Sequence, residues 1–130
     1  HLLEIEHQRA AAAVDFHAVE LHAGVNPDFF KGTRVEAAAR KVIVDAGYGP
    51  GFKYLTHRVG HGLGLEAHED PSLDPGSAVV LEEGMVFTVE PGVYIPGWGG
   101  VRIEDDVVVE RSECRVLTKA DRSLRVIPER

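Results

Sequence analysis

The chain has 130 residues, of which 44% are hydrophobic and 27% are charged. This is the composition of an ordinary globular domain, and it excludes a collagen-like repeat, a disordered tail and a membrane span. Fourteen Lys and Arg residues accompany 21 Asp and Glu residues, so the net charge is −7 and the basic surface typical of nucleic-acid binding is absent.

The negative charge is concentrated in the segment 64–106. Ten acidic residues in this segment accompany a single basic residue, Arg102. Solubility alone does not usually require so local an excess. The segment is therefore where we look first for carboxylates with a specific role.

The single cysteine, Cys114, cannot form an internal disulfide. The first residues contain no basic region followed by an apolar run of signal-peptide length, so a cytoplasmic location is expected. No histidine stands at a suggestive spacing from Cys114, and a catalytic thiol is not expected. The chain begins with His1 and not with Met, which suggests a piece of a longer protein.

Two helices are predicted in the first part of the chain. The run from Leu2 to Ala23 has no Gly or Pro and repeats apolar residues near helical spacing. Thr33 and Glu36 have the spacing of a capping box, which predicts the start of a second helix. Gly47 is a natural stop for that helix.

Short β-rich runs punctuated by Gly and Pro follow the glycine-rich link that begins at Gly47. Strands are predicted over 54–59, 78–81, 85–90, 93–95 and 101–109. Residues 96–100 suit a hairpin connector between the last two. Two helices followed by antiparallel strands make an α+β pattern.

Three of the seven histidines, His57, His61 and His68, lie within twelve residues of one another. If this stretch is extended, His57 and His61 point to the same face, because side chains alternate along a strand. Glycines at 60, 62 and 64 leave the backbone around His61 without bulk, which helps a ligand or metal ion to approach. Neutral imidazole suits first-row transition metals.

Two carboxylates stand apart from the solvent-facing acids. Glu90 closes the apolar run 85–89, and Glu104 lies within the predicted strand 101–109. An acid in a buried strand is costly unless it is paired or bound to a metal ion. Structural roles stay open, because a histidine is more often a hydrogen-bonded structural residue and strand carboxylates commonly pair with Arg or face water.

Three motifs resemble, in order and spacing, the pita-bread metallopeptidases. They are His57-x-x-Gly60-His61-Gly62-x-Gly64-Leu65-x-x-His68-Glu69-x-Pro71, then Thr88-Val89-Glu90-Pro91-Gly92-x-Tyr94, then Arg102-Ile103-Glu104-Asp105-Asp106. The last motif is similar to the proline-specific branch, which contains prolidase and aminopeptidase P, and differs from that of the methionine aminopeptidases.

The resemblance implies a dinuclear metallopeptidase. Its two divalent ions would be held by His61 and Glu90 as terminal ligands and by Glu104 as a bridging carboxylate. Manganese is favoured, and cobalt, zinc and iron are also compatible with these donors. A metal-bridged hydroxide would attack the peptide bond, with Glu90 as the proton acceptor and His68 stabilising the oxyanion.

The same resemblance implies a substrate pocket lined by His57, His68, Arg102 and Tyr94. The substrates would be dipeptides or short peptides with proline after the cleaved bond. Neither a nucleic acid nor a membrane is expected as a partner.

The family site has two further aspartate ligands, which lie well before the metal-binding histidine. Only 60 residues precede His61, and Asp15, Asp28 and Asp45 are not placed as such a pair. Residues 1–130 are therefore expected to be the C-terminal half of a pita-bread domain. We expect this piece to be inactive alone, and to pair as a homodimer or with the missing N-terminal part.

Two other hypotheses are weighed. A metal-free descendant of the fold would bind peptides or partners without cleaving them, but it has no need for His61, Glu90, Glu104 and His68 together. A mononuclear iron site built from His57, His61 and one glutamate would leave the second glutamate and His68 unexplained.

Overall fold

The computed structural model describes residues 31–111 and 113–121, and the predicted helix over 2–23 lies outside them. In chain order the described elements are α2 (Gly32–Asp45), β1 (Gly60–Gly62), β2 (Glu69–Leu73), β3 (Val86–Val89), β4 (Gly92–Ile95), β5 (Gly99–Arg102), β6 (Asp105–Val109) and β7 (Cys114–Val116). Within this part of the chain, no helix is long and apolar enough to cross a membrane.

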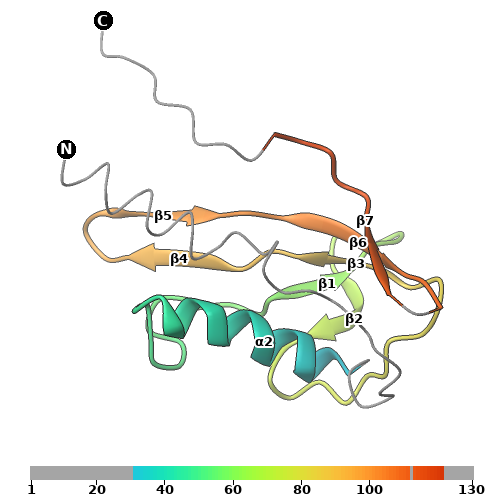
Figure 1. Ribbon diagram of the computed structural model, residues 1–130, viewed down its shortest axis with the longest axis horizontal. Helices are drawn as coiled ribbons and strands as arrows, with labels where there is room; N and C mark the ends of the chain where they lie inside the picture. Colours follow the sequence, from blue (N-terminus) through green and yellow to red (C-terminus); the bar gives the residue numbers. More distant parts are fainter. Residues whose placement is uncertain (1–30, 112, 122–130) are drawn as a thin grey trace, which may run out of the picture.

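The strands form two antiparallel sheets, and α2 lies along one side of them in contact with β2 (Figure 1). The larger sheet has the order β2-β1-β3-β6-β7, and β4 pairs with β5. Two residues separate β3 from β4, and two separate β5 from β6, so the β4–β5 hairpin continues the β3–β6 pair. The α+β class and the antiparallel strands are confirmed. A hairpin connector follows β4 as predicted, but it spans 96–98, because Gly99 and Gly100 pair within β5.

Helix α2 confirms the second predicted helix, but the predicted capping box is wrong. The N-cap is Lys31 rather than Thr33, and it makes no side-chain cap hydrogen bond. The Gly32 N–H instead donates to a backbone carbonyl of the loop after β2, 3.0 Å away, because the chain enters the helix beside that loop. Glu36 is 3% exposed and pairs with Arg40, one turn further on.

The predicted glycine stop is confirmed. Helix α2 ends at Asp45, and Gly47 follows with a φ of +94°. Glycine reaches this left-handed region without the steric cost that a Cβ atom imposes. The N–H groups of Gly47 and Tyr48 donate to carbonyls of the last helical turn, so the turn is closed.

Several strand predictions are wrong. Residues 54–59 form turns and irregular chain, although Leu55 and Val59 are fully buried. Burial of apolar surface is non-directional and does not require strand pairing. Residues 78–81 contribute one isolated bridge, and the predicted strand 101–109 is divided at 103–104 into β5 and β6.

Strands β2 and β7, which were not predicted, are the two edges of the larger sheet. An edge strand has one unpaired side, so it tolerates proline and charge and lacks the apolar run of a central strand. Pro71 lies in β2, and Arg115 lies in β7. Their sequences therefore carry little of the pattern by which strands are predicted.

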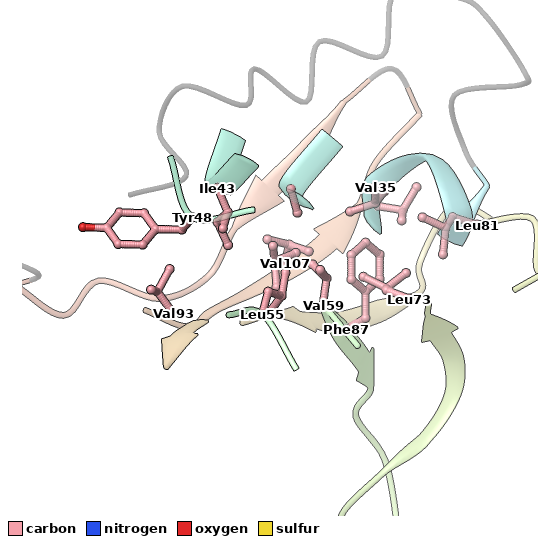
Figure 2. Packing of buried hydrophobic residues seen from close by; sticks show 13 residues of the cluster. Val35, Ile43, Tyr48, Leu55, Val59, Leu73, Leu81, Phe87, Val93 and Val107 are labelled. Atoms are coloured by element: carbon pink, nitrogen blue, oxygen red, sulfur yellow. The ribbon is translucent and has the colours of Figure 1, made fainter. Parts of the chain in front are cut away.

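The hydrophobic core lies between α2 and the sheets (Figure 2). Val35 and Ile43 on the helix face Phe87 and Val107 on the central strands. Phe87 is the largest of the fully buried side chains and is 0% exposed. Glu90 directly follows β3, so packing around Phe87 also fixes the position of the Glu90 backbone.

Replacement of Phe87 by alanine is expected to lower the free energy of unfolding by about 3–5 kcal/mol, because a fully buried aromatic ring leaves a cavity. The matched control is Phe52→Ala, since Phe52 is 53% exposed and contacts the Arg40 guanidinium. We expect that control to cost below about 1 kcal/mol. Urea denaturation measures both, and equal losses would contradict the proposed core.

Candidate metal centre

Glu90 and Glu104 lie at the junction between the two sheets. Glu90 follows β3, and Glu104 precedes β6. The β3–β6 ladder ends at the pair Val89 and Asp105, and the β4–β5 ladder resumes beyond the junction in the same register. Continued across the junction, that register places Glu90 opposite Glu104. Two carboxylates opposite each other repel unless a cation lies between them.

His61 lies at the centre of β1, which is held between β2 and β3. A Cβ atom on Gly60 would stand 1.8 Å from the carbonyl oxygen of Thr88, and one on Gly62 would stand 1.9 Å from that of Asp70. The two glycines therefore allow the neighbouring strands to approach. This differs from the predicted reason, which was room for a ligand around His61.

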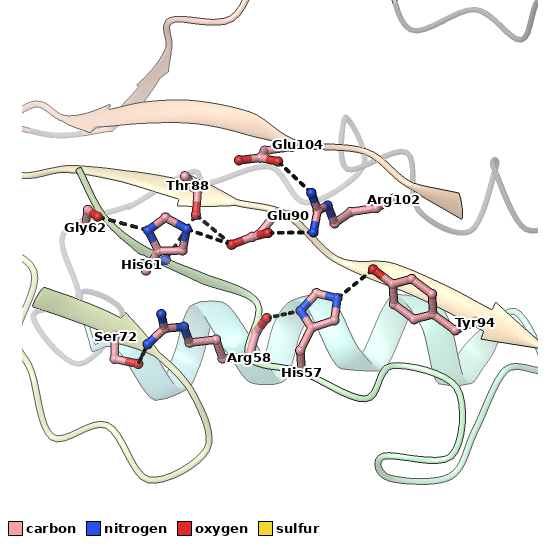
Figure 3. A network of polar contacts seen from close by, with 10 residues as sticks. All are labelled: His57, Arg58, His61, Gly62, Ser72, Thr88, Glu90, Tyr94, Arg102 and Glu104. Atoms are coloured by element: carbon pink, nitrogen blue, oxygen red, sulfur yellow. Dashed lines mark hydrogen bonds and ion pairs between the residues drawn. The ribbon is translucent and has the colours of Figure 1, made fainter. Parts of the chain in front are cut away.

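The side chains of His61 and Glu90 meet in a buried position (Figure 3). His61 Nε2 lies 3.1 Å from Glu90 Oε1, and the two side chains are 8% and 10% exposed. His61 Nδ1 lies 2.9 Å from the carbonyl oxygen of Gly62. Because a carbonyl oxygen only accepts, the tautomer that bonds to it carries its proton on Nδ1 and presents the Nε2 lone pair to the carboxylate.

Two acceptors that face each other in a buried position are stabilised by a proton or a metal ion between them. Ligand atoms bound at about 2.1 Å and at a right angle are separated by about 3 Å, close to the distance between His61 Nε2 and Glu90 Oε1. Imidazole nitrogen and carboxylate oxygen also suit manganese, cobalt, zinc and iron. The pair therefore fits a divalent ion in donor type and spacing.

Thr88 links the two donors and was assigned no role from the sequence. Its Oγ1 accepts a hydrogen bond from the His61 N–H at 3.1 Å and lies 3.2 Å from Glu90 Oε1, to which it donates. Thr88 is 1% exposed, so this hydroxyl has exchanged water for these two partners. The available signal was a polar residue two positions before Glu90 in an otherwise apolar run.

Arg102 connects Glu90 to Glu104. Its Nη1 lies 3.5 Å from Glu90 Oε2, and its Nη2 lies 3.6 Å from Glu104 Oε2. Across residues 31–111 and 113–121, no three His, Cys, Asp or Glu side chains are grouped closely enough to hold one ion. The structure thus brings His61 and Glu90 into direct contact, whereas Glu104 reaches them through Arg102. The ligand roles of these residues stay predictions.

The exposed ring of His68 lies beside the buried ring of His61. The two centroids are 4.3 Å apart at an interplanar angle of 71°. His68 precedes β2 and belongs to the loop that follows His61. This position leaves His68 open to solvent next to the His61–Glu90 pair, while its predicted catalytic role stays untested.

His57 and Tyr94 contact each other in the same polar network as His61 and Glu90 (Figure 3). His57 Nε2 lies 3.0 Å from the Tyr94 hydroxyl, and Nδ1 lies 2.6 Å from the carbonyl oxygen of Arg58. The prediction that His57 and His61 share one strand face is wrong, because β1 begins only at Gly60 and His57 precedes it. Contact of His57 or Tyr94 with substrate stays a prediction.

Of the three aspartates set aside as ligands from the sequence, Asp45 alone lies within the described residues. Asp15 and Asp28 lie outside the described residues, and Asp45 forms an ion pair with Lys41 at the end of α2. Asp74 accepts hydrogen bonds from the Ser72 hydroxyl and a backbone N–H in the turn after β2, and these bonds lower the pKa of its carboxyl group. Its role is to stabilise that turn.

Cys114 is half-buried on β7. Burial, and secondly the neighbouring charge of Glu113, raise the pKa of its thiol. A nucleophilic cysteine needs a lowered pKa, so the environment of Cys114 opposes thiolate formation. This supports the expectation that it is not a catalytic thiol.

An open pocket of about 320 Å³ lies near the other end of β3 from Glu90. Its lining residues are Leu63, Glu69, Asp70, Pro71, Val79, Gly84, Met85 and Val86. None of them is a predicted catalytic, substrate-binding or metal-binding residue. The pocket is therefore separate from the site built around His61 and Glu90.

Comparison with known proteins finds a match to the model of metallopeptidase family M24 over residues 4–111. The chain is 50% identical over 96 residues to the Xaa-Pro dipeptidase of Lactobacillus delbrueckii subsp. lactis, covering 74% of the chain and 25% of that protein. It is 42% identical over 123 residues to the Xaa-Pro dipeptidase of Lactobacillus helveticus, covering 95% of the chain and 33% of that protein.

A solved Xaa-Pro dipeptidase from Bacillus anthracis has the same architecture. It superposes with a TM-score of 0.81 at 40% sequence identity, covering 94% of this chain and 33% of that one. The chain thus spans between a quarter and a third of the length of these relatives.

Replacement of Thr88 by valine is expected to lower the free energy of unfolding by about 1–3 kcal/mol, because the buried His61 N–H loses its acceptor and Glu90 loses a donor. The matched control is Thr88→Ser, which keeps the hydroxyl. Chemical denaturation at neutral pH measures both. If valine and serine cost the same, the hydroxyl bridge contributes nothing and the account of Thr88 is wrong.

Proposed function

This chain belongs to metallopeptidase family M24, and from that premise we propose that it forms the C-terminal part of the catalytic domain of an Xaa-Pro peptidase. The proposed reaction is hydrolysis of the bond before proline in dipeptides or short peptides. Family membership confirms the resemblance predicted from the three motifs, together with its pita-bread fold. The relatives named Xaa-Pro dipeptidase support the substrate class.

The observation that carries the proposal is the buried contact between His61 Nε2 and Glu90 Oε1. These two side chains would hold a divalent ion, and Glu104 would add a carboxylate from the opposite strand. When bound, the metal ions supply Lewis-acid polarisation of the peptide carbonyl and lower the pKa of a bound water. We propose manganese as the ion, with cobalt, zinc and iron as compatible alternatives.

Glu90 and His68 are assigned two different roles in the proposed reaction. Glu90 is fixed at Oε1 by the Thr88 hydroxyl, so its carboxylate is oriented to accept a proton from the attacking water. His68 lies exposed beside His61, where it can donate a hydrogen bond to the oxygen of the cleaved carbonyl. This assignment separates the proton acceptor from the oxyanion donor.

The wall of the proposed substrate pocket, beside His61 and Glu90, would be formed by His57, Tyr94 and Arg102. The Arg58 carbonyl accepts from His57 Nδ1–H, so His57 Nε2 accepts from the Tyr94 hydroxyl and the ring is held in one orientation. Half-exposed Arg102 supplies positive charge next to Glu90. Such a charge suits the carboxylate of a dipeptide ending in proline.

We also propose that the 130-residue chain does not carry out the full reaction alone. Within the described residues the donors in direct contact are His61 and Glu90, and Glu104 joins them only through Arg102. The partner would be a second copy or the preceding part of a longer chain. A cytoplasmic location is proposed from the single cysteine.

A chimaera tests this proposal directly. We would replace the matched segment of the Lactobacillus helveticus Xaa-Pro dipeptidase with this chain, to which that enzyme is 42% identical. With manganese, the chimaera is expected to hydrolyse Ala-Pro and not Ala-Ala. Glu90→Gln should lower kcat by about a hundredfold or more, because the proton acceptor is lost.

The control variant is Glu110→Gln, at the other end of the strand pair, which should leave kcat within about twofold of the chimaera. Circular dichroism and thermal unfolding verify that each chimaera is folded. A folded chimaera that binds manganese and cleaves Ala-Ala as well as Ala-Pro would contradict the proline-specific assignment. A folded chimaera without any peptidase activity would contradict the proposed function itself.

A further inference from the structure

We infer that the Arg102 guanidinium is a built-in counter-cation for the carboxylates of Glu90 and Glu104, and that a divalent ion must displace it to be bound by both. This inference rests on the proposed function for the identity of the two carboxylates as metal ligands. It assigns Arg102 to control of metal occupancy, which is a different task from contact with substrate.

The sheet register creates the need for such a cation. The ladders on either side of the junction share one register, which places Glu90 opposite Glu104. Like charges directly opposite on paired strands destabilise the pairing. Arg102 stands two residues before Glu104, so the alternation of side chains along the strand puts it on the same face. It is also the single basic residue of the acidic segment 64–106.

The contact geometry is that of an ion pair on each side. Nη1 and Nη2 of Arg102 reach different carboxylates, at 3.5 Å and 3.6 Å. These distances exceed those of N–H···O hydrogen bonds, which are usually 2.7–3.2 Å, so charge attraction dominates over directional bonding. The other oxygen of Glu90 is already held by Thr88 and faces His61. Release of Arg102 would therefore leave Glu90 in place.

A comparison with Arg40 shows which arginine is free to leave. The Arg40 side chain is 13% exposed, pairs with Glu36, and donates to the carbonyl oxygens of Gly51 and Leu55. Arg102 is 49% exposed and its described partners are carboxylates. A long half-exposed side chain moves its charged head into water at little cost, whereas Arg40 is fixed by the surrounding backbone.

Removal of Arg102 therefore has opposite effects in the two states. Without metal, the facing carboxylates lose their counter-charge and the fold is less stable. With metal, the ion no longer competes with a resident cation and binds more tightly. A positioning role for Arg102, in which it holds the ligands ready for the ion, predicts the reverse sign for metal affinity.

The test uses the 130-residue chain and two substitutions, Arg102→Met and Arg102→Lys. Thermal unfolding is recorded in EDTA, and Mn²⁺ binding is measured by isothermal titration calorimetry. Arg102→Met is expected to lower the melting temperature in EDTA by a few degrees and to lower the Mn²⁺ Kd roughly three- to tenfold. Arg102→Lys retains the charge and is expected to stay near the wild type in both.

The matched control is Arg115→Met, which removes the same charge from an ion pair with Glu110 at the far end of β6. Arg115→Met should leave the Mn²⁺ Kd unchanged. An equal change of Kd in both variants would show a general effect of net charge. An unchanged or weakened Mn²⁺ affinity in Arg102→Met would overturn the inference. Absence of Mn²⁺ binding by the wild type would also overturn the displacement of Arg102 by metal, whereas the proposed function, which places further ligands outside this chain, is tested separately by the chimaera.

Discussion

The arrangement of this molecule depends on one contact, the meeting of His61 Nε2 and Glu90 Oε1 at 3.1 Å in a buried position. In the tautomer that donates to the Gly62 carbonyl from Nδ1, the facing atoms Nε2 and Oε1 are both acceptors. A proton or a metal ion between the two atoms stabilises such a contact. The packing of β1 against β3 therefore places these two donors where a cation can be bound.

The sheets supply the second constraint. Two long chain segments run from one sheet into the other, and their shared junction carries Glu90 on one segment and Glu104 on the other. The core beneath, centred on Phe87, fixes the strand that leads into Glu90. Negative charge concentrated in 64–106 thus has a partial explanation, since two of the ten acids face each other across a junction where they pair with Arg102. The net charge of −7 is that of the chain without metal, and bound divalent cations would make the net charge less negative.

The order and spacing of the motifs predicted the family and the fold class, both of which are confirmed. The structure brings the predicted ligands His61 and Glu90 into contact, and their roles stay predictions. Edge strands β2 and β7 were missed because an edge needs no apolar run. The capping box failed because a bridge to a distant loop replaced the side-chain cap of α2. Thr88 was missed because its importance lies in a tertiary contact between two strands, which spacing along one strand does not reveal.

The most direct test of the central claim is an imidazole ¹⁵N spectrum of His61 in the 130-residue chain at neutral pH, recorded before and after addition of Zn²⁺. The account predicts that Nδ1 keeps its proton throughout and that the Nε2 resonance moves to a metal-coordinated position when Zn²⁺ is added. A proton on Nε2 with a bare Nδ1, and a spectrum that does not respond to Zn²⁺, would contradict it.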